Sequence, residues 1–265
     1  MAVAPKRQVA DKRTFRLDAW WAQPATCAFF FSVFVLWATF RAFENNFYSA
    51  PHHLHDLYQA GKIGDLLSPM YSPLIPVDWN VFGKQFSPAI LILVFPLSFR
   101  LTCYYFRRMY YRSYFFTPPA CAVEGTSRKG YTGERNFPLT LQNLHRFTWY
   151  FDAIFILLLA YDVVKSMQYV SGWGVSVGTF VLLLDVLLLG AYTFGCHSCR
   201  HACGGCVNSF SKHKGLHRLW KLATRLNERH AEFAWISLVW VGLTDVYVRL
   251  VTSGVIQDVV FARFG

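Results

Sequence analysis

Long apolar stretches alternate with short polar ones along this chain, and the alternation predicts its architecture. Five stretches approach the length of about 20 residues that a helix needs to cross a bilayer. They cover residues 24–43, 87–106, 145–170, 173–195 and 231–250. Only a short link around Ser171 and Gly172 joins the third and fourth stretches, so we expect these two spans to form an antiparallel hairpin. The pattern predicts an all-α membrane protein, a five-transmembrane-helix bundle forming one membrane-anchor domain over residues 1–265.

Basic residues gather in alternate segments between the predicted spans. The first tail and the loops after the second and fourth spans are rich in lysine and arginine, and examples are Lys12, Arg16, Arg107, Arg112, Lys214 and Arg225. The remaining loops carry few. Because lysine and arginine are retained in cytoplasmic loops, we expect a cytoplasmic N-terminus and a C-terminus outside. No small-residue cleavage site follows the first apolar stretch, which indicates a retained span.

The composition supports a membrane protein. Hydrophobic residues make up 54% of the chain and charged residues 15%, against roughly 25% charged residues in ordinary globular proteins. The net charge of +11 is explained by the cytoplasmic loops, so we expect no nucleic-acid partner. Leucines alternate with basic residues over 211–230, which predicts an amphipathic surface helix, and residues 15–21 predict another.

Four cysteines and two histidines crowd into eleven residues after the fourth span. The spacing is C-x2-C-x3-C-x2-C, and the candidate metal ligands are Cys196, His197, Cys199, His201, Cys203 and Cys206. His145 and His230, at the same predicted membrane face, are alternative histidine ligands. The cytoplasm is reducing, so metal ligation or redox chemistry is favoured over disulfides.

Several readings of this stretch stay open. A structural zinc site with four thiolates fits the spacing. A four-cysteine iron–sulfur cluster fits as well, and so does a Rieske-type [2Fe–2S] cluster with two cysteines and two histidines. Unligated, reduced cysteines are the remaining reading. No histidine lies in the middle of a span, so we do not expect haem. His52, His53 and His55 in the first outer loop are read as solvated histidines, with metal binding as the alternative.

Charged and aromatic residues near the spans suggest further roles. Asp185 is the most central charge, and it is a candidate for a proton path or for pairing with Arg100. Asp245 and Arg249 are four residues apart and predict an ion pair within one helix. Candidate quinone-binding residues lie near the cytoplasmic interface, and they are Arg16, Trp20, Trp21 and Gln23.

The whole pattern resembles a known family. Five spans, an inside N-terminus and the sequence Gly-Cys-His-Ser-Cys-Arg-His-Ala-Cys-Gly-Gly-Cys over 195–206 resemble the single-chain membrane anchor of succinate dehydrogenase/fumarate reductase, of the mycobacterial succinate dehydrogenase 1 type. The resemblance implies a bacterial plasma-membrane subunit with a membrane-embedded Rieske-type [2Fe–2S] cluster in place of haem. It also implies flavoprotein and iron–sulfur partner subunits on the cytoplasmic face, menaquinone as acceptor, and a homo-oligomer of the complex as one assembly.

The function that follows is electron relay by a subunit of a succinate:quinone oxidoreductase that has no substrate-oxidising site of its own. Two alternatives remain at this point. One is a redox subunit of another quinone oxidoreductase, and the other is a zinc-stabilised membrane transporter or sensor. The absence of a repeat and of a polar track through several spans argues against transport.

Overall fold

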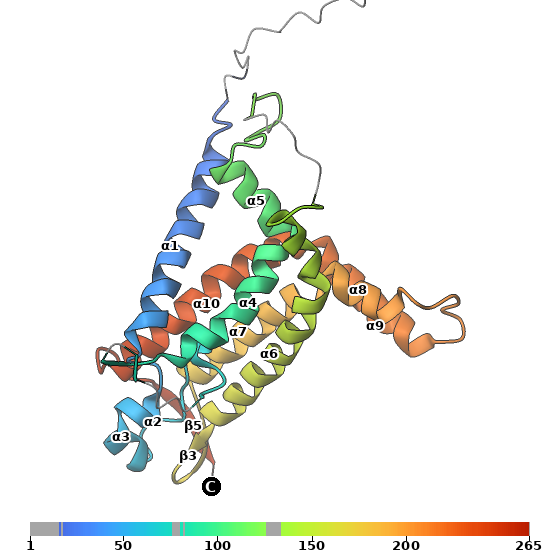
Figure 1. The fold of residues 1–265 in the computed structure, drawn as a ribbon. Coiled ribbons are helices and arrows are strands. Elements are labelled where there is room, and N and C mark those ends of the chain that lie inside the picture. Colours follow the sequence, from blue (N-terminus) through green and yellow to red (C-terminus); the bar gives the residue numbers. More distant parts are fainter. Residues whose placement is uncertain (1–15, 17, 76–79, 82, 126–133, 265) are drawn as a thin grey trace, which may run out of the picture.

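The fold is a bundle of long helices. The computed structural model describes residues 16–264 apart from 17, 76–79, 82 and 126–133. Its long helices are α1 (Ala22–Glu44), α4 (Pro88–Thr102), α6 (His145–Ser166), α7 (Val177–Phe194) and α10 (His230–Thr252). Figure 1 shows α4, α6, α7 and α10 gathered together while α1 leans away from them at one end. The predicted helical bundle is confirmed in its main elements.

Four of these helices are long and apolar enough to cross a membrane. They are α1, α7, α10 and α6, the last extended by the 3-10 helix η2 (Leu139–Leu144). The predicted second span, residues 87–106, is broken. Helix α4 ends at Thr102, and α5 (Tyr104–Tyr114) continues at an angle of 78° to it, so a fifth span exists only if this bent pair counts as one. Cys103 adopts an extended backbone, φ −63° and ψ 131°, and thereby separates the two helices.

Helix α5 crosses from the bundle to α1. Its tyrosines and arginines make it far more polar than α4, which suits a helix at a membrane boundary. At its far end the Tyr114 hydroxyl donates a hydrogen bond to the Ala28 carbonyl, 2.9 Å away, and lies 2.8 Å from the Ser32 hydroxyl. Helix α5 therefore bridges the gap between α1 and the bundle that Figure 1 shows.

The link between the third and fourth spans is a β-hairpin. Strands β3 (Gln168–Tyr169) and β4 (Gly172–Ser176) pair antiparallel, and β4 also pairs with β5 (Val260–Phe264). The predicted spans 145–170 and 173–195 were therefore each too long at this end. Helix α7 begins only at Val177, where Ser176 and Thr179 form a reciprocal capping box. Shorter elements complete this end: α2 (Ala50–His53), α3 (His55–Gln59), η1 (Pro69–Tyr71), β1 (Asn80–Val81) and β2 (Lys84–Gln85).

A buried ion-pair network joins α1 to α10. Asp245 accepts a hydrogen bond from Arg41 Nε at 2.9 Å and another from Trp37 Nε1 at 2.8 Å, and the side chains of Asp245 and Arg41 are fully buried. Glu44 pairs with both Arg41 and Arg249. The predicted ion pair between Asp245 and Arg249 is therefore wrong, because each residue finds its partner on α1 and not on its own helix.

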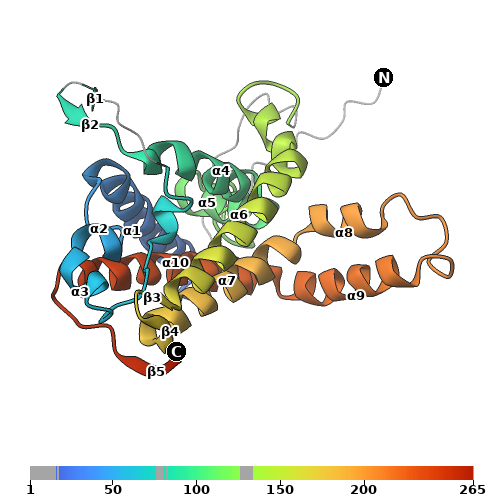
Figure 2. The same ribbon diagram turned by 90° about the horizontal axis from the view of Figure 1, so that it is seen from below.

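A helical hairpin leaves the other end of the bundle. Helices α8 (His197–Gly204) and α9 (Lys214–Glu228) pack against each other, and Figures 1 and 2 show them projecting sideways. The predicted helix over 211–230 is confirmed over Lys214–Glu228. The helix predicted at 15–21 is not formed over 18–21, where the chain makes a turn before α1 begins, and residues 15 and 17 lie outside the described part.

Candidate functional site

The predicted cysteine–histidine stretch is spread along a helix and is not folded around one point. Cys196 caps the N-terminus of α8, and Cys199 is buried one turn later with Cys203 half-buried beside it. The side chains of His197, His201 and Cys206 are exposed. In the described part of the chain, no three His, Cys, Asp or Glu residues are arranged to hold a single metal ion. The four cysteines therefore do not form the compact thiolate site that zinc requires.

Cys196 lies instead in a second group of thiols and imidazoles drawn from four parts of the chain. Cys103 comes from the break between α4 and α5, and His145 and His230 are the first residues of α6 and α10. His145 Nε2 is 3.0 Å from Cys196 Sγ, and Cys103 Sγ is 3.8 Å from His230 Nε2. Cys103, Cys196 and His230 are each no more than 2% exposed. We call these four residues the Cys/His centre.

Aromatic rings hold the two histidines in place. His145 stacks on Phe99 with ring centres 4.8 Å apart and an angle of 7° between the planes. His230 stacks in the same way on Tyr192, at 4.9 Å and 14°. Phe99 and Tyr192 contact each other at 5.3 Å, so the rings form one continuous support. The stacking restricts both imidazoles to orientations that point toward the cysteines.

The Nδ1 atom, which is the ring nitrogen that does not face a cysteine, has a hydrogen-bond partner in His145 but not in His230 within the described residues. The Nδ1 atom of His145 lies 3.0 Å from the Thr102 hydroxyl, which leaves Nε2 directed at Cys196. A second hydrogen bond of this kind is what orients a metal-ligating histidine. The Nδ1 atom of His230 is buried and makes no hydrogen bond with the described residues.

The donor set of the Cys/His centre suits a [2Fe–2S] cluster better than a single ion. A Rieske-type cluster takes two cysteines at one iron and two histidines at the other, so its four ligands need not surround one point. Burial raises the pKa of Cys196 to about 11, and the nearby Cys103 thiol adds to the shift. Burial and the adjacent Cys203 raise the pKa of Cys199 to about 12. These thiols stay protonated until a metal displaces the proton.

Sequence reasoning missed Cys103. It is a single cysteine within an apolar run, without the spacing that marked residues 196–206. Its position could have identified it, because Cys103 falls at the same predicted membrane face as His145, Cys196 and His230. Only the break of the second span aims its side chain into the bundle.

Arg100 lies next to the Cys/His centre on α4. Its guanidinium is 4.7 Å from the centre of the Tyr192 ring, and it donates hydrogen bonds to the Ala234 carbonyl at 3.2 Å and the Ser237 hydroxyl at 3.0 Å. No ion pair joins it to Asp185 in the described residues. The predicted pairing of Asp185 with Arg100 is therefore not formed as a direct contact.

Asp185 is the most isolated carboxylate in the bundle. It is 1% exposed in the middle of α7, and neither carboxylate oxygen has a hydrogen-bond partner in the described residues. Asp152 on α6, nearer the Cys/His centre, is also buried but accepts a hydrogen bond from the Thr193 hydroxyl at 2.6 Å. An unpaired buried carboxyl group is costly as an anion, so Asp185 is suited to hold and exchange a proton.

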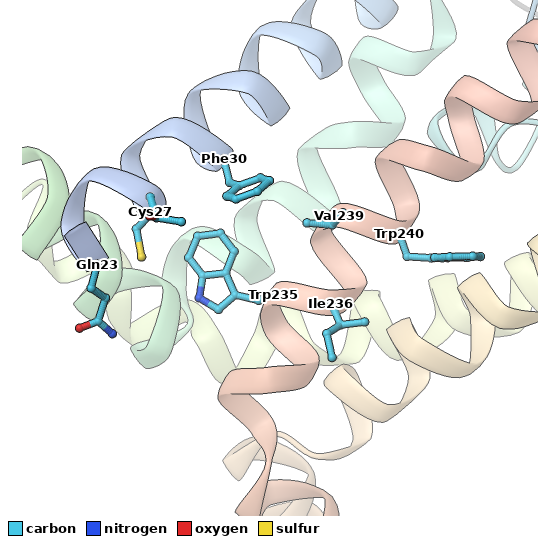
Figure 3. A pocket seen from close by; sticks show the side chains of 8 residues that line it. Gln23, Cys27, Phe30, Trp235, Ile236, Val239 and Trp240 are labelled. Atoms are coloured by element: carbon cyan, nitrogen blue, oxygen red, sulfur yellow. The ribbon is translucent and has the colours of Figure 1, made fainter.

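Two apolar pockets open between the helices. The first, of about 580 Å³, lies between α1 and α10, where Gln23 of α1 and Ile236 of α10 are among its lining residues, and Figure 3 shows Trp235 of α10 reaching toward Cys27 and Phe30 of α1. The second, of about 800 Å³, is lined by α1, α4, α5 and α6 and reaches the side chains of Arg100, Tyr192 and Asp152. Only the second pocket contacts residues that support the Cys/His centre.

Of the predicted quinone-binding residues, Gln23 alone lines one of these two pockets. Arg16 pairs with Asp18 and donates a hydrogen bond to the Cys121 carbonyl at 2.8 Å. Trp20 and Trp21 lie in the turn before α1, and the Trp21 side chain is 60% exposed. These three residues do not line either pocket.

The histidines of the loop after α1 are engaged with one another and with their own loop. His53 lies 2.6 Å from the Asn46 side-chain oxygen and accepts a hydrogen bond from the Phe47 amide at 3.0 Å. The rings of His52 and His53 contact each other at 4.5 Å, and the His55 side chain is exposed. This arrangement packs the loop against the end of α1.

Comparisons with known proteins agree with the resemblance seen in the sequence. The family model described as actinobacterial succinate dehydrogenase subunit SdhC matches residues 22–254. Among solved structures, the chain is similar to one from the Mycobacterium smegmatis Sdh1 complex in the apo form, with 38% identity, a TM-score of 0.83 and coverage of 98% of each chain. The search of curated proteins found no match. The chain therefore belongs to the actinobacterial succinate dehydrogenase SdhC family and is a membrane subunit of a succinate dehydrogenase complex.

Proposed function

We propose that this subunit relays electrons from soluble succinate dehydrogenase subunits to menaquinone through a Rieske-type [2Fe–2S] cluster held by Cys103, Cys196, His145 and His230. The observation that carries the proposal is the convergence of these four side chains, three buried and His145 half-buried, from four separate helix ends. When bound, such a cluster supplies one-electron redox chemistry at a potential that its histidine ligands raise.

This ligand set revises the one expected from the sequence. Cys196 is common to both sets, and His145 and His230 were the alternative histidines. Cys103 is new. Five residues of the original stretch fall outside the proposed set, because no contact joins them to His145 or His230 in the described residues: His197, Cys199, His201 and Cys203 on α8, and Cys206 just after it.

Residues next to the Cys/His centre orient its ligands and set its electrostatic surroundings. The hydroxyl of Thr102 fixes the His145 ring, and the rings of Phe99 and Tyr192 each cover one face of an imidazole. The positive charge of Arg100 lies against the Tyr192 ring and favours added electron density nearby. Hydrophobic surroundings and nearby charge of this kind tune the potential of a metal centre.

The pocket between α1, α4, α5 and α6 is the better candidate for the quinone. Its walls are almost entirely apolar, which suits an isoprenoid chain, while Arg100 and Asp152 supply polar groups at its inner end. The pocket beside Gln23 has no such contact with the Cys/His centre. We propose that Asp185, with Asp152, holds protons that accompany quinone reduction.

A matched pair of pocket-filling variants tests the quinone site. Leu101 and Ile236 are similarly exposed, at 48% and 49%, and line the second and first pocket respectively. Replacing Leu101→Trp should raise the KM for menaquinone by about tenfold, because overpacking a pocket costs 1–3 kcal/mol. Ile236→Trp should leave it unchanged. The reverse result would assign the quinone to the pocket beside Gln23.

The partners follow from the family and the predicted orientation. We propose that a flavoprotein subunit and an iron–sulfur subunit bind on the cytoplasmic face, where the N-terminus, α5, α8 and α9 carry 13 of the chain's 26 lysine and arginine residues. A homo-oligomer of this complex in the bacterial plasma membrane remains part of the proposal.

The cluster itself is tested by iron analysis and low-temperature EPR of the purified complex. We expect a reduced Rieske-type signal in addition to those of the soluble subunits' clusters. Zinc in place of that iron, or a spectrum that is unchanged when this subunit is stripped from the soluble subunits, would contradict the proposal.

A further inference from the structure

Helix α9 carries a basic face and an apolar face that nothing in the described structure covers. Lys214, Arg218, Lys221 and Arg225 are spaced four, three and four residues apart, so they share one side of the helix. All four side chains are exposed, and none forms an ion pair with a described residue. A row of unpaired cations of this kind matches a surface that carries negative charge.

The apolar face lies directly beside the basic one. Leu219 and Leu222 are 53% and 55% exposed, and Leu226, one turn later on the same side, is half-buried beside Gly195. Two large leucines left in water are unfavourable by the transfer free energy of their side chains. The two faces together are typical of a helix that lies within a membrane interface, with leucines toward the acyl chains and basic residues at the headgroups.

The third side of α9 is fixed, so the helix cannot rotate to hide its leucines. Ala223 is buried, and the Trp220 ring contacts Phe210 at 5.4 Å. The Asn227 side chain donates a hydrogen bond to the Gly195 carbonyl at 2.8 Å, at the end of α7. The contacts with α8 and α7 therefore set the orientation of both free faces.

The position of α9 puts those faces at the depth of the membrane surface. A single residue, Arg229, separates its end from the start of the membrane helix α10, and Gly195 ends α7 at the same level. Helix α9 has 15 residues, which gives it a length of about 22 Å. Figures 1 and 2 show that it projects from the bundle, and Figure 1 shows that it turns away from the direction of α10.

We infer that α9 is an interfacial helix that binds anionic phospholipid, with Lys214, Arg218, Lys221 and Arg225 at the phosphates and Leu219 and Leu222 below them. The inference concerns lipid contact only and does not depend on the Cys/His centre or on quinone reduction.

Hydrogen–deuterium exchange of the purified complex in lipid nanodiscs tests this inference. We compare discs of phosphatidylcholine alone with discs that also contain phosphatidylglycerol. Amides of residues 214–228 should exchange several-fold more slowly in the phosphatidylglycerol discs. Each basic residue at the surface contributes about 1 kcal/mol, so Lys221→Gln should reduce that protection about fivefold. Exchange that is equal in both discs would overturn the inference.

Matched variants separate lipid contact from other causes. Lys62→Gln removes an exposed lysine near the opposite end of the bundle and should leave the exchange of α9 unchanged. Leu222→Ser should make the amides of α9 exchange faster, whereas Leu57→Ser, at an exposed leucine of α3, should leave that exchange unchanged. Slow exchange of α7 and α10 in each variant shows that the bundle is intact. If the slow exchange of α9 requires the soluble subunits and is the same in both kinds of disc, this face binds a protein partner and the inference is overturned.

Discussion

The ion pair between Arg41 and Asp245 offers a test of what holds α1 to the bundle. Replacing Asp245→Asn keeps the size of the side chain and removes its charge. It weakens the hydrogen bonds from Arg41 and Trp37 and the one from the Ser68 hydroxyl. Breaking a buried ion pair costs 3–5 kcal/mol, because the remaining charge is left uncompensated.

The expected cost lies near the lower end of that range. Arg41 keeps its contact with Glu44 and donates a hydrogen bond to the Asn46 carbonyl at 2.9 Å, so its charge remains partly compensated. We expect a loss of about 3 kcal/mol. For a chain of this size the corresponding fall in apparent melting temperature is about 6–12 °C.

Thermal unfolding of the purified complex, followed by tryptophan fluorescence at a fixed heating rate, measures the effect. Asp56→Asn on the exposed side of α3 is the control, and it should change stability by less than about 0.5 kcal/mol. The double variant Arg41→Met/Asp245→Leu should be more stable than Asp245→Asn alone, because it buries no unpaired charge. An Asp245→Asn protein as stable as the control would refute the reasoning.

Three further predictions address protons, packing and pH. Asp185→Asn should slow succinate-driven quinone reduction at least about tenfold while dye reduction by the soluble subunits is unchanged, and normal quinone turnover would make Asp185 a packing residue. Gly64→Ala should destabilise the subunit by about 1–3 kcal/mol, because its Cβ would overlap the Ser166 carbonyl oxygen, whereas Gly215→Ala meets no atom within 4 Å and should not. Burial lowers the pKa of His53, so the unfolded chain binds the proton more readily and stability should fall as the pH drops below about 6.5. His53→Gln should flatten that dependence in melting curves, and an unchanged slope would show that other groups cause it.

Apolar patterning predicted the bundle well but placed some of its ends wrongly. The spans around α1 and α10 agree with the structure to within two residues at each end. Residues 173–176 were assigned to a span because they continue its apolar run, yet they pair with β5 as a strand. Apolar content alone does not distinguish a strand from the first turn of a buried helix. The partner strand lies almost 90 residues further along, and local sequence gives no sign of it.

The candidate site shows a similar limit. Close spacing drew attention to residues 196–206, although only Cys196 of that stretch reaches the Cys/His centre. Cys103, His145 and His230 are far apart in the sequence, and the packing of four helix ends brings them together. In the same way Asp245 pairs with Arg41 across two helices in preference to its i+4 neighbour, Arg249. Spacing rules describe contacts within a helix, whereas both of these arrangements are tertiary.

Iron content and EPR of two matched cysteine variants test the proposed ligand set most directly. Cys103→Ser removes a cysteine that the sequence pattern missed, and Cys203→Ser removes one that the pattern selected; both should be measured in the purified complex. We expect Cys103→Ser to lose the two iron atoms of one [2Fe–2S] cluster together with the Rieske-type signal, and Cys203→Ser to retain both. Loss of iron and signal in Cys203→Ser, with both kept in Cys103→Ser, would contradict the assignment and return the cluster to residues 196–206.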